Sequence, residues 1–208
     1  TQNALASVNL EIECGKFVVI LGPSGAGKST FLNLLGGLDN PTSGTIIVDG
    51  TDISTLSSDE LADYRAAKVG FVFQSYNLIP TLTVLENISL IEEIAPDHMS
   101  AAELLAEVGL DDHAHQFPHE LSGGEQQRVA IARSLASGAK LLLADEPTGN
   151  LNFAIGEQVI KELLEVSRGK TLIAVTHDDR LAKYFDEVID MNEMTSGMRD
   201  TVTGKEAD

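Results

Sequence analysis

Basic residues are scarce in this sequence, which has 14 lysines and arginines against 32 aspartates and glutamates and a formal net charge of −18. A surface with this charge repels nucleic acid and anionic lipid at long range, so we expect neither as a direct partner. We interpret the acidity as a solubility device. The single cysteine, Cys14, excludes an internal disulfide and fits a reducing compartment.

Long apolar runs are also missing, since no run reaches the roughly 18 residues that a membrane-spanning helix needs. The longest candidates, Phe17–Leu21 and Leu141–Ala144, have the length of buried strands. Thr1–Gly15 lacks the basic start and the apolar middle of a signal peptide. We therefore expect a cytoplasmic protein that meets a membrane only through a partner.

Apolar strand-like runs alternate with helical stretches along the chain, a pattern that predicts an α/β fold with a mostly parallel core sheet. Strands are expected at Lys16–Leu21, Thr45–Val48, Val69–Phe73, Lys140–Ala144, Thr171–Val175 and Glu187–Asp190. Helices are expected at Lys28–Leu35, Ser58–Ala67, Gly123–Ser137 and Asn152–Ser167.

The stretch from about 76 to 137 is mostly helical and interrupts this pattern. Ser100 and Glu103 have the spacing of a capping box, and Gly109 is placed to end the helix that follows. The sequence therefore predicts one domain, with a core formed by 1–75 and 138–208 and an inserted helical subdomain.

A phosphate-binding motif follows the first strand. Residues 22–29 read GPSGAGKS, which matches G-x-x-x-x-G-K-[ST] between a strand and a helix. Its glycines let backbone N–H groups wrap around phosphate oxygens, and the start of the helix adds positive potential. Lys28 would reach the β- and γ-phosphates and Ser29 would ligate Mg²⁺, whereas the alternative is a chance glycine turn. The expected nucleotide contacts are Gly22, Pro23, Ser24, Gly25, Ala26, Gly27, Lys28, Ser29 and Thr30.

Two carboxylates end the apolar strand near residue 144. Asp145 is placed to hold Mg²⁺, directly or through water, and Glu146 to polarise the attacking water. Paired acids after a strand are common by themselves. In a chain that also carries a phosphate loop, they indicate hydrolysis of a nucleoside triphosphate.

The residues from Leu121 to Arg128 read LSGGEQQR and resemble the signature of the ABC ATPases. Ser122, Gly123 and Gly124 precede a helix and can form a second anion site, although a helix cap with no ligand is the plain alternative. In the resembling family this site faces the γ-phosphate that the other subunit binds. The resemblance covers essentially the whole chain and implies a P-loop NTPase core with a small antiparallel β part.

The resemblance also implies roles for two further residues. Gln74 occupies the position of a glutamine that ligates Mg²⁺ and water and couples to a transmembrane partner. His177 occupies the position of a histidine that touches the γ-phosphate, while the other histidines, including His113, are interpreted as surface residues. The implied cofactors are ATP and Mg²⁺, and the implied state is a homodimer closed around two ATP molecules.

Finer features, in residues 69–78 and 145–151, resemble the branch of lipoprotein-release, macrolide-export and cell-division ATPases. The resemblance implies a permease subunit with an external domain, ATP-driven export or extraction, and a location on the inner face of the cell membrane. Tyr76, Leu78 and Ile79 would contact that partner, or would only pack locally. The alternatives are a regulatory ATPase that moves no cargo and a DNA-repair or chromosome ATPase, which the short helical insertion and the acidity disfavour.

Two positions depart from the family pattern. Asn152 stands where the family usually has an aspartate that helps to link the two ATP sites, and it keeps the hydrogen-bonding capacity but loses the charge. The residues before Lys16 contain no aromatic side chain that could stack on adenine, and we expect the upstream strand of the family to be missing. No adenine-stacking residue is therefore predicted.

Overall fold

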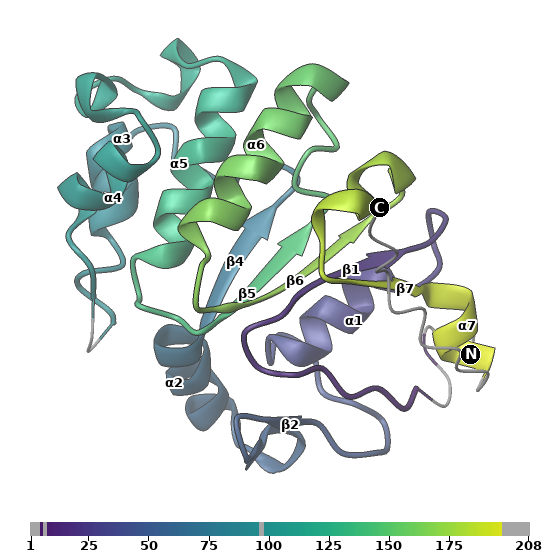
Figure 1. Ribbon diagram of the computed structural model, residues 1–208. Helices are drawn as coiled ribbons and strands as arrows, with labels where there is room; N and C mark the ends of the chain where they lie inside the picture. The colour runs from purple at the N-terminus through teal and green to yellow at the C-terminus, as the bar shows by residue number, and fades with distance from the viewer. Residues whose placement is uncertain (1–4, 6–7, 96–97, 197–208) are drawn as a thin grey trace.

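A five-stranded parallel sheet forms the centre of the molecule (Figure 1). The computed structural model describes residues 5, 8–95 and 98–196. The strands lie in the order β4-β5-β6-β1-β7, and each neighbouring pair is parallel. Their bounds are β1 Phe17–Leu21, β4 Val69–Phe73, β5 Leu141–Asp145, β6 Thr171–Thr176 and β7 Glu187–Asp190.

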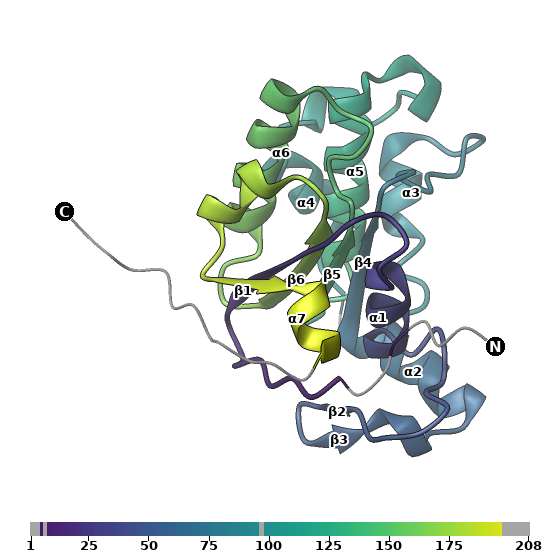
Figure 2. The same ribbon diagram turned by 90° about the vertical axis from the view of Figure 1, so that its right-hand side faces the viewer.

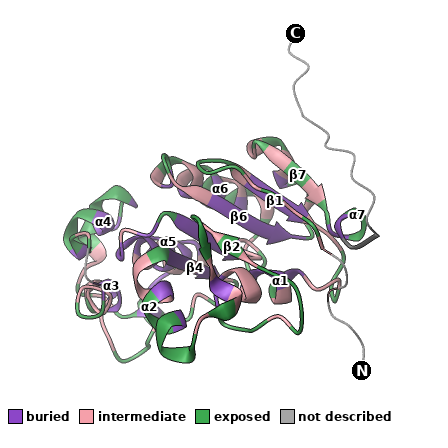
Figure 3. Cartoon of the chain, turned by 90° about the horizontal axis from the view of Figure 1, so that it is seen from below, coloured by how far each residue is buried: buried purple, intermediate pink, exposed green. Residues whose placement is uncertain are grey.

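The central strands are apolar on both faces because helices cover both sides of the sheet (Figures 1 and 3). On one side, Leu142 and Ala144 pack in a core with α5 and α6. On the other, Leu143 packs in a core with α1 and α2. The helices are α1 Lys28–Leu35, α2 Ser58–Lys68, α3 Val84–Ser89, α4 Ala101–Glu107, α5 Gly123–Leu135, α6 Phe153–Val166 and α7 Met191–Ser196.

Smaller elements complete the architecture. The strands β2 Ile47–Val48 and β3 Thr51–Asp52 form an antiparallel ribbon below α1 and α2 (Figure 2). The 3₁₀ helices are η1 Ile53–Thr55, η2 Asp111–His113, η3 Pro118–Glu120 and η4 Asp179–Tyr184. Among the helices of the described residues, none is both long and apolar enough to cross a bilayer.

The predicted fold class is confirmed, and most predicted elements lie within two residues of their observed bounds. The predicted strand Thr45–Val48 is too long, because only Ile47 and Val48 pair with β3. No strand is present among described residues 8–16, where Val8, Leu10 and Ile12 instead pack against the core of α1 and α2.

The predicted capping box at Ser100 is wrong. The Ser100 side chain makes no capping hydrogen bond, and the backbone N–H of Ala101 donates to Glu92 Oε1 at 2.7 Å. A carboxylate from the preceding turn thus satisfies one of the free N–H groups at the start of α4. The predicted end is confirmed, since α4 stops before Gly109, which has a φ of +66°.

Candidate functional site

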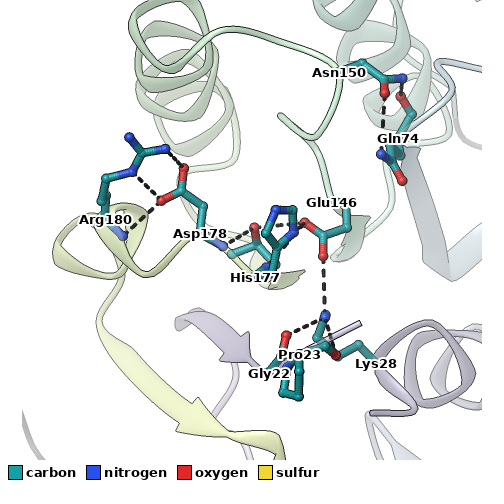
Figure 4. A network of polar contacts seen from close by, with 10 residues as sticks. Gly22, Pro23, Lys28, Gln74, Glu146, Asn150, His177, Asp178 and Arg180 are labelled. Carbon is teal, nitrogen blue, oxygen red and sulfur yellow. Dashed lines mark hydrogen bonds and ion pairs between the residues drawn. The ribbon is translucent and has the colours of Figure 1, made fainter. Parts of the chain in front are cut away.

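Four loops leave the same edge of the sheet, because the carboxyl ends of parallel strands lie together. The register pairs Leu21 of β1 with Thr176 of β6, and Asp145 of β5 with Val175 of β6 and Phe73 of β4. The sheet order therefore brings together residues that follow β1, β4, β5 and β6, as Figure 4 shows.

The phosphate loop, residues 22–29, connects β1 to α1 through two left-handed glycines. Gly25 has a φ of +80° and Gly27 a φ of +96°, which lie in a backbone region that residues other than glycine rarely adopt. A Cβ on Gly25 would meet nothing within 4 Å, so the loop has open space beside it. The backbone N–H groups at the start of α1 can thus bind an anion there.

Lys28 is the buried cation of the site and is only 6% exposed. Its Nζ donates to the carbonyl oxygens of Gly22 at 2.6 Å and Pro23 at 3.1 Å. It also lies 3.4 Å from Glu146 Oε1, with both side chains largely buried (Figure 4). A buried ammonium needs such partners, and the negative charge of a phosphate could replace the carboxylate among them.

Glu146 is held at both carboxylate oxygens. While Oε1 faces Lys28, Oε2 accepts from Thr176 Oγ1 at 3.0 Å and from the His177 backbone N–H at 3.3 Å. The His177 ring Nδ1 lies 2.9 Å from the same oxygen. Glu146 has a φ of +45°, an uncommon conformation for a side chain of this type. The strain and the contacts together aim the carboxylate across the sheet edge toward the phosphate loop.

Asp145 and Ser29 are the oxygen donors nearest in the chain to this pair. Asp145 is the half-buried last residue of β5, and Ser29 is exposed on the first turn of α1. Within the described residues, no group of three or more His, Cys, Asp or Glu side chains could hold a metal ion by itself. A hydroxyl and a carboxylate supplemented by phosphate oxygens are a donor set that suits Mg²⁺.

Gln74 does not join this cluster by a described hydrogen bond and is tied to Asn150 instead (Figure 4). Asn150 Nδ2 donates to the Gln74 carbonyl oxygen at 2.8 Å, and Gln74 Nε2 donates to Asn150 Oδ1 at 3.4 Å. A Cβ on Gly149 would lie 2.7 Å from Gln74 Nε2, so the glutamine side chain runs directly over this glycine. Asn150 was not predicted as a site residue, because nothing in the sequence around it indicates a contact with Gln74, which follows a different strand.

The signature turn, Ser122-Gly123-Gly124, begins α5. Ser122 is the N-cap, and its N–H and Oγ both donate to Glu125 Oε2 at 2.7 Å. These bonds from Ser122 lower the pKa of Glu125. A Cβ on Gly124 would lie 2.8 Å from Ile155 Cγ2, which explains why a glycine is needed there.

Ser122 is exposed, and among the described residues no hydrogen bond or ion pair joins it to the phosphate loop. Within the signature turn, Ser122 is therefore accessible to another molecule, whereas Gly123 is half-buried and Gly124 is buried. The nearby His113 is not a surface residue as predicted, because it is half-buried and its Nε2 lies 3.7 Å from Glu125 Oε1. The three-residue helix η2 places it under the signature turn, which the local sequence does not indicate.

The turn after β6 is fixed by a bidentate ion pair. Arg180 Nε and Nη2 each donate to a carboxylate oxygen of Asp178 at 2.7 Å, and these hydrogen bonds lower the pKa of Asp178. The Arg180 guanidinium also lies 4.0 Å from the centre of the Phe153 ring on α6. This support holds the backbone of His177 next to Glu146.

Comparison with known proteins assigns this chain to a family. The family model described as "ABC transporter" matches residues 5–149. The chain belongs to the ABC transporter family. An uncharacterised ABC transporter ATP-binding protein of Thermotoga maritima is 49% identical over 84% of this chain and 77% of that protein. The macrolide export ATP-binding/permease protein MacB of Bradyrhizobium diazoefficiens is 47% identical over 91% of this chain and 30% of its own length.

A solved ABC cassette has the same fold. The dimeric structure of MJ0796 in a post-hydrolysis state, bound to ADP and Pi, matches with a TM-score of 0.81 and 43% sequence identity. The match covers 97% of this chain and 92% of that chain. The chain is accordingly an ABC-type ATP-binding domain, and the resemblance identified from the sequence is confirmed.

Asn152 departs from the usual aspartate of the ABC pattern without disturbing the local fold. It is the N-cap of α6, and its Oδ1 accepts from the Ile155 N–H at 3.1 Å. Asparagine and aspartate are about equally good N-caps, so the exchange removes a charge and keeps this hydrogen bond. The exchange therefore leaves the N-terminal capping of α6 intact.

Replacing Asn150 with alanine should lower the rate constant for ATP hydrolysis by up to about tenfold and leave ATP affinity nearly unchanged. The change removes the hydrogen bond from Asn150 Nδ2 to the Gln74 carbonyl oxygen, which is worth about 1 kcal/mol and positions the backbone of the glutamine. Steady-state kinetics would separate kcat from KM. Gln158→Ala is the matched control, because it removes a side-chain amide bonded to Glu162 on the surface of α6. Equal kinetics in the two variants would contradict a role for the Asn150 contact.

Proposed function

We propose that this chain is the ATP-hydrolysing subunit of a membrane transport machine and works as a homodimer that closes around two ATP molecules. The observation that carries the proposal is the division of the site. Lys28 and Glu146 are paired at the phosphate loop, whereas Ser122 of the signature turn is exposed and, among the described residues, has no hydrogen bond or ion pair to them. Neither half is sufficient by itself, and a second copy supplies the missing half.

The residues present fit ATP and Mg²⁺. The open phosphate loop and the start of α1 would hold the phosphates, and Lys28 would bind their β- and γ-oxygens. Ser29 and Asp145 would hold Mg²⁺, with Gln74 as a further ligand once its amide turns from Asn150. When bound, Mg²⁺ neutralises charge on the phosphate oxygens during transfer.

Glu146 is the general base of the proposed reaction. When phosphate oxygens replace Glu146 as the partner of Lys28, the Oε1 atom of Glu146 is released and can accept a proton from water. The oxygen of that water forms a bond to the γ-phosphorus while the bond from this phosphorus to the bridging oxygen breaks, which yields ADP and phosphate. Thr176 and His177 keep the carboxylate in place through Oε2, and the exposed His177 ring, which contacts Glu146 through Nδ1, would reach the γ-phosphate through Nε2.

The second subunit contributes the signature turn. Ser122 and the backbone N–H groups of Gly123 and Gly124 would face the γ-phosphate held by the partner, with the start of α5 adding positive potential. ATP then holds the dimer together, and loss of the γ-phosphate lets it open. The dimeric MJ0796 cassettes support this arrangement.

The proposed partner is a transmembrane permease with an external domain, which would place the chain on the inner face of the cell membrane. MacB, which is named as a combined ATP-binding/permease protein, supports this arrangement. Of the three predicted partner contacts, Ile79 is 40% exposed, Leu78 packs against the core and Tyr76 turns toward Gly123. Ile79 is therefore the contact that we retain. The division into a core and an inserted helical subdomain at 76–137 belongs to the same proposal.

Complementation between two inactive variants tests the shared site. Ser122→Asp keeps an N-cap on α5 but places a carboxylate against the partner's phosphates, and Lys28→Met disables the phosphate loop. Mixed together, they form one site with the intact phosphate loop of the first and the intact signature turn of the second. We expect hydrolysis well above the sum of the separate rates.

Ser122→Asn is the matched control, since it caps the helix without adding charge and should retain more activity than Ser122→Asp. If mixing gave only the sum of the two separate rates, each chain would hydrolyse ATP on its own. That result would refute the proposed dimer.

A further inference from the structure

The loop after β4 contains two consecutive left-handed residues that are not glycine. Tyr76 has a φ of 60° and Asn77 a φ of 52°. Only four non-glycine residues of the described chain have positive φ, and these are the only two that are adjacent. Such a backbone costs free energy and persists where the surrounding structure holds it, often at functional sites and switch regions.

Arg133 holds this strained turn from the last part of α5. Its Nη1 donates to the Asn77 carbonyl oxygen at 2.6 Å, and its Nη2 donates to the Tyr76 carbonyl oxygen at 2.9 Å. The planar guanidinium thus binds both carbonyls of the turn with two separate N–H groups held in a rigid fork, a geometry that the single ammonium of a lysine does not offer. The signature turn lies at the start of the same helix.

Tyr76 connects the loop to that other end of α5. A Cβ on Gly123 would lie 3.0 Å from the Tyr76 hydroxyl oxygen, so the phenol rests directly on the signature glycine. Gly123 and Arg133 are about three helical turns apart. The loop is therefore fastened to α5 at two separated points, and it cannot shift along the helix without breaking one of them.

Gln74 lies two residues before this turn and is tied to Asn150 after β5. A continuous set of contacts thus runs from the signature turn through α5 and Arg133 to the glutamine of the same chain. We propose that Arg133 is a positioning residue that keeps the signature turn and Gln74 in a fixed spatial relation. Binding of the partner's nucleotide by the signature turn would then also fix the position of Gln74. This inference rests on the proposed function, which gives Gln74 and Ser122 their roles.

Replacing Arg133 with methionine tests the coupling. ATP affinity of the isolated chain is set by the phosphate loop and should stay within about twofold of the parent value. In contrast, kcat should fall by about tenfold, the effect of losing hydrogen bonds to a charged donor. ATP-driven dimer formation, measured by analytical ultracentrifugation in a Glu146→Gln background, should need about tenfold more protein.

Arg65→Met is the matched control. Arg65 is also half-buried and donates to a loop carbonyl, that of Gly37 at 2.6 Å, but it lies on α2 away from the signature turn. A purely structural role of Arg133 would lower the melting temperature of both variants alike and leave kcat and dimer formation at parent values. That result would overturn the proposal.

A second substitution tests whether Arg133 acts through the strained turn. Asn77→Gly relieves the left-handed conformation, because glycine adopts it without steric cost. Added to Arg133→Met, it should restore kcat several-fold, and added to Arg65→Met it should restore nothing. Arg133→Lys, which keeps the charge but replaces the rigid fork with a single flexible ammonium, should show an intermediate loss. Failure of Asn77→Gly to restore any activity would overturn the proposed route.

The two proposals fail in different ways. If the parent chain neither hydrolyses ATP nor dimerises with it, the proposed function fails. If the parent does both and Arg133→Met matches it in kcat and dimer formation, the coupling alone fails.

Discussion

Glu146→Gln is expected to lower the rate of ATP hydrolysis by about 10²- to 10⁴-fold, the usual contribution of a general base. Glutamine can still accept a hydrogen bond from Thr176, but it cannot take up the proton of the attacking water. It also removes the charge that neutralises Lys28, so ATP should bind as tightly as in the parent or more tightly. Hydrolysis assays and ATP titrations would measure the two effects separately.

Because it cannot hydrolyse the nucleotide, this variant should accumulate as a dimer with ATP bound, which size-exclusion chromatography would detect. Glu157→Gln is the matched control, because this half-buried glutamate pairs with Lys161 at 3.0 Å and accepts from the Tyr184 hydroxyl, with no described contact to the phosphate loop. Its hydrolysis rate should equal that of the parent. Hydrolysis by Glu146→Gln at the parent rate would show that another group is the base.

Lys28→Met is expected to weaken ATP binding by about 10- to 100-fold, because charge-assisted hydrogen bonds of this kind contribute about 1.5–3 kcal/mol. Lys28 is buried, and methionine fills a similar volume, so the loop should keep its shape. Titration with a fluorescent ATP analogue would give the affinity. Lys68→Met is the control, since Lys68 forms an exposed pair with Asp49 at 3.7 Å.

Unchanged affinity in Lys28→Met would show that backbone N–H groups alone hold the phosphates. The double variant Lys28→Met/Glu146→Gln separates stability from binding. Methionine leaves Glu146 without its cation, and glutamine removes this unpaired charge. We therefore expect the double variant to regain thermal stability relative to Lys28→Met while its ATP affinity stays low.

The ion pair between Lys28 and Glu146 suggests why both variants should have large effects. In the proposed mechanism each group is the partner that a reactant would replace, since a phosphate would take the place of the carboxylate beside Lys28 and the attacking water that of the ammonium beside Glu146. ATP binding would then perform two functions with one exchange of partners, because it would recruit the lysine and release the proposed base.

Local patterns predicted the elements of this protein well. The buried runs of β1 and β5 and the glycines of the phosphate loop depend on neighbouring residues only, and they lie where the sequence places them. The capping prediction at Ser100 failed, because its side chain makes no capping hydrogen bond and a carboxylate from another turn, that of Glu92, binds the N–H of Ala101 at the start of the helix. The same kind of pattern is realised at Ser57, Thr83 and Ser122, each of which forms a complete capping box.

The sequence by itself determined the class of fold, the phosphate loop, the acidic strand end and the signature turn, since each is a contiguous motif whose backbone conformation follows from its own residues. Only the tertiary structure decided which of these meet. Gln74 and Asn150 are 76 positions apart, and Arg133 and Tyr76 are 57. Such contacts depend on the strand order β4-β5-β6-β1-β7, which is set by how helices and strands bury apolar surface together and not by any local pattern.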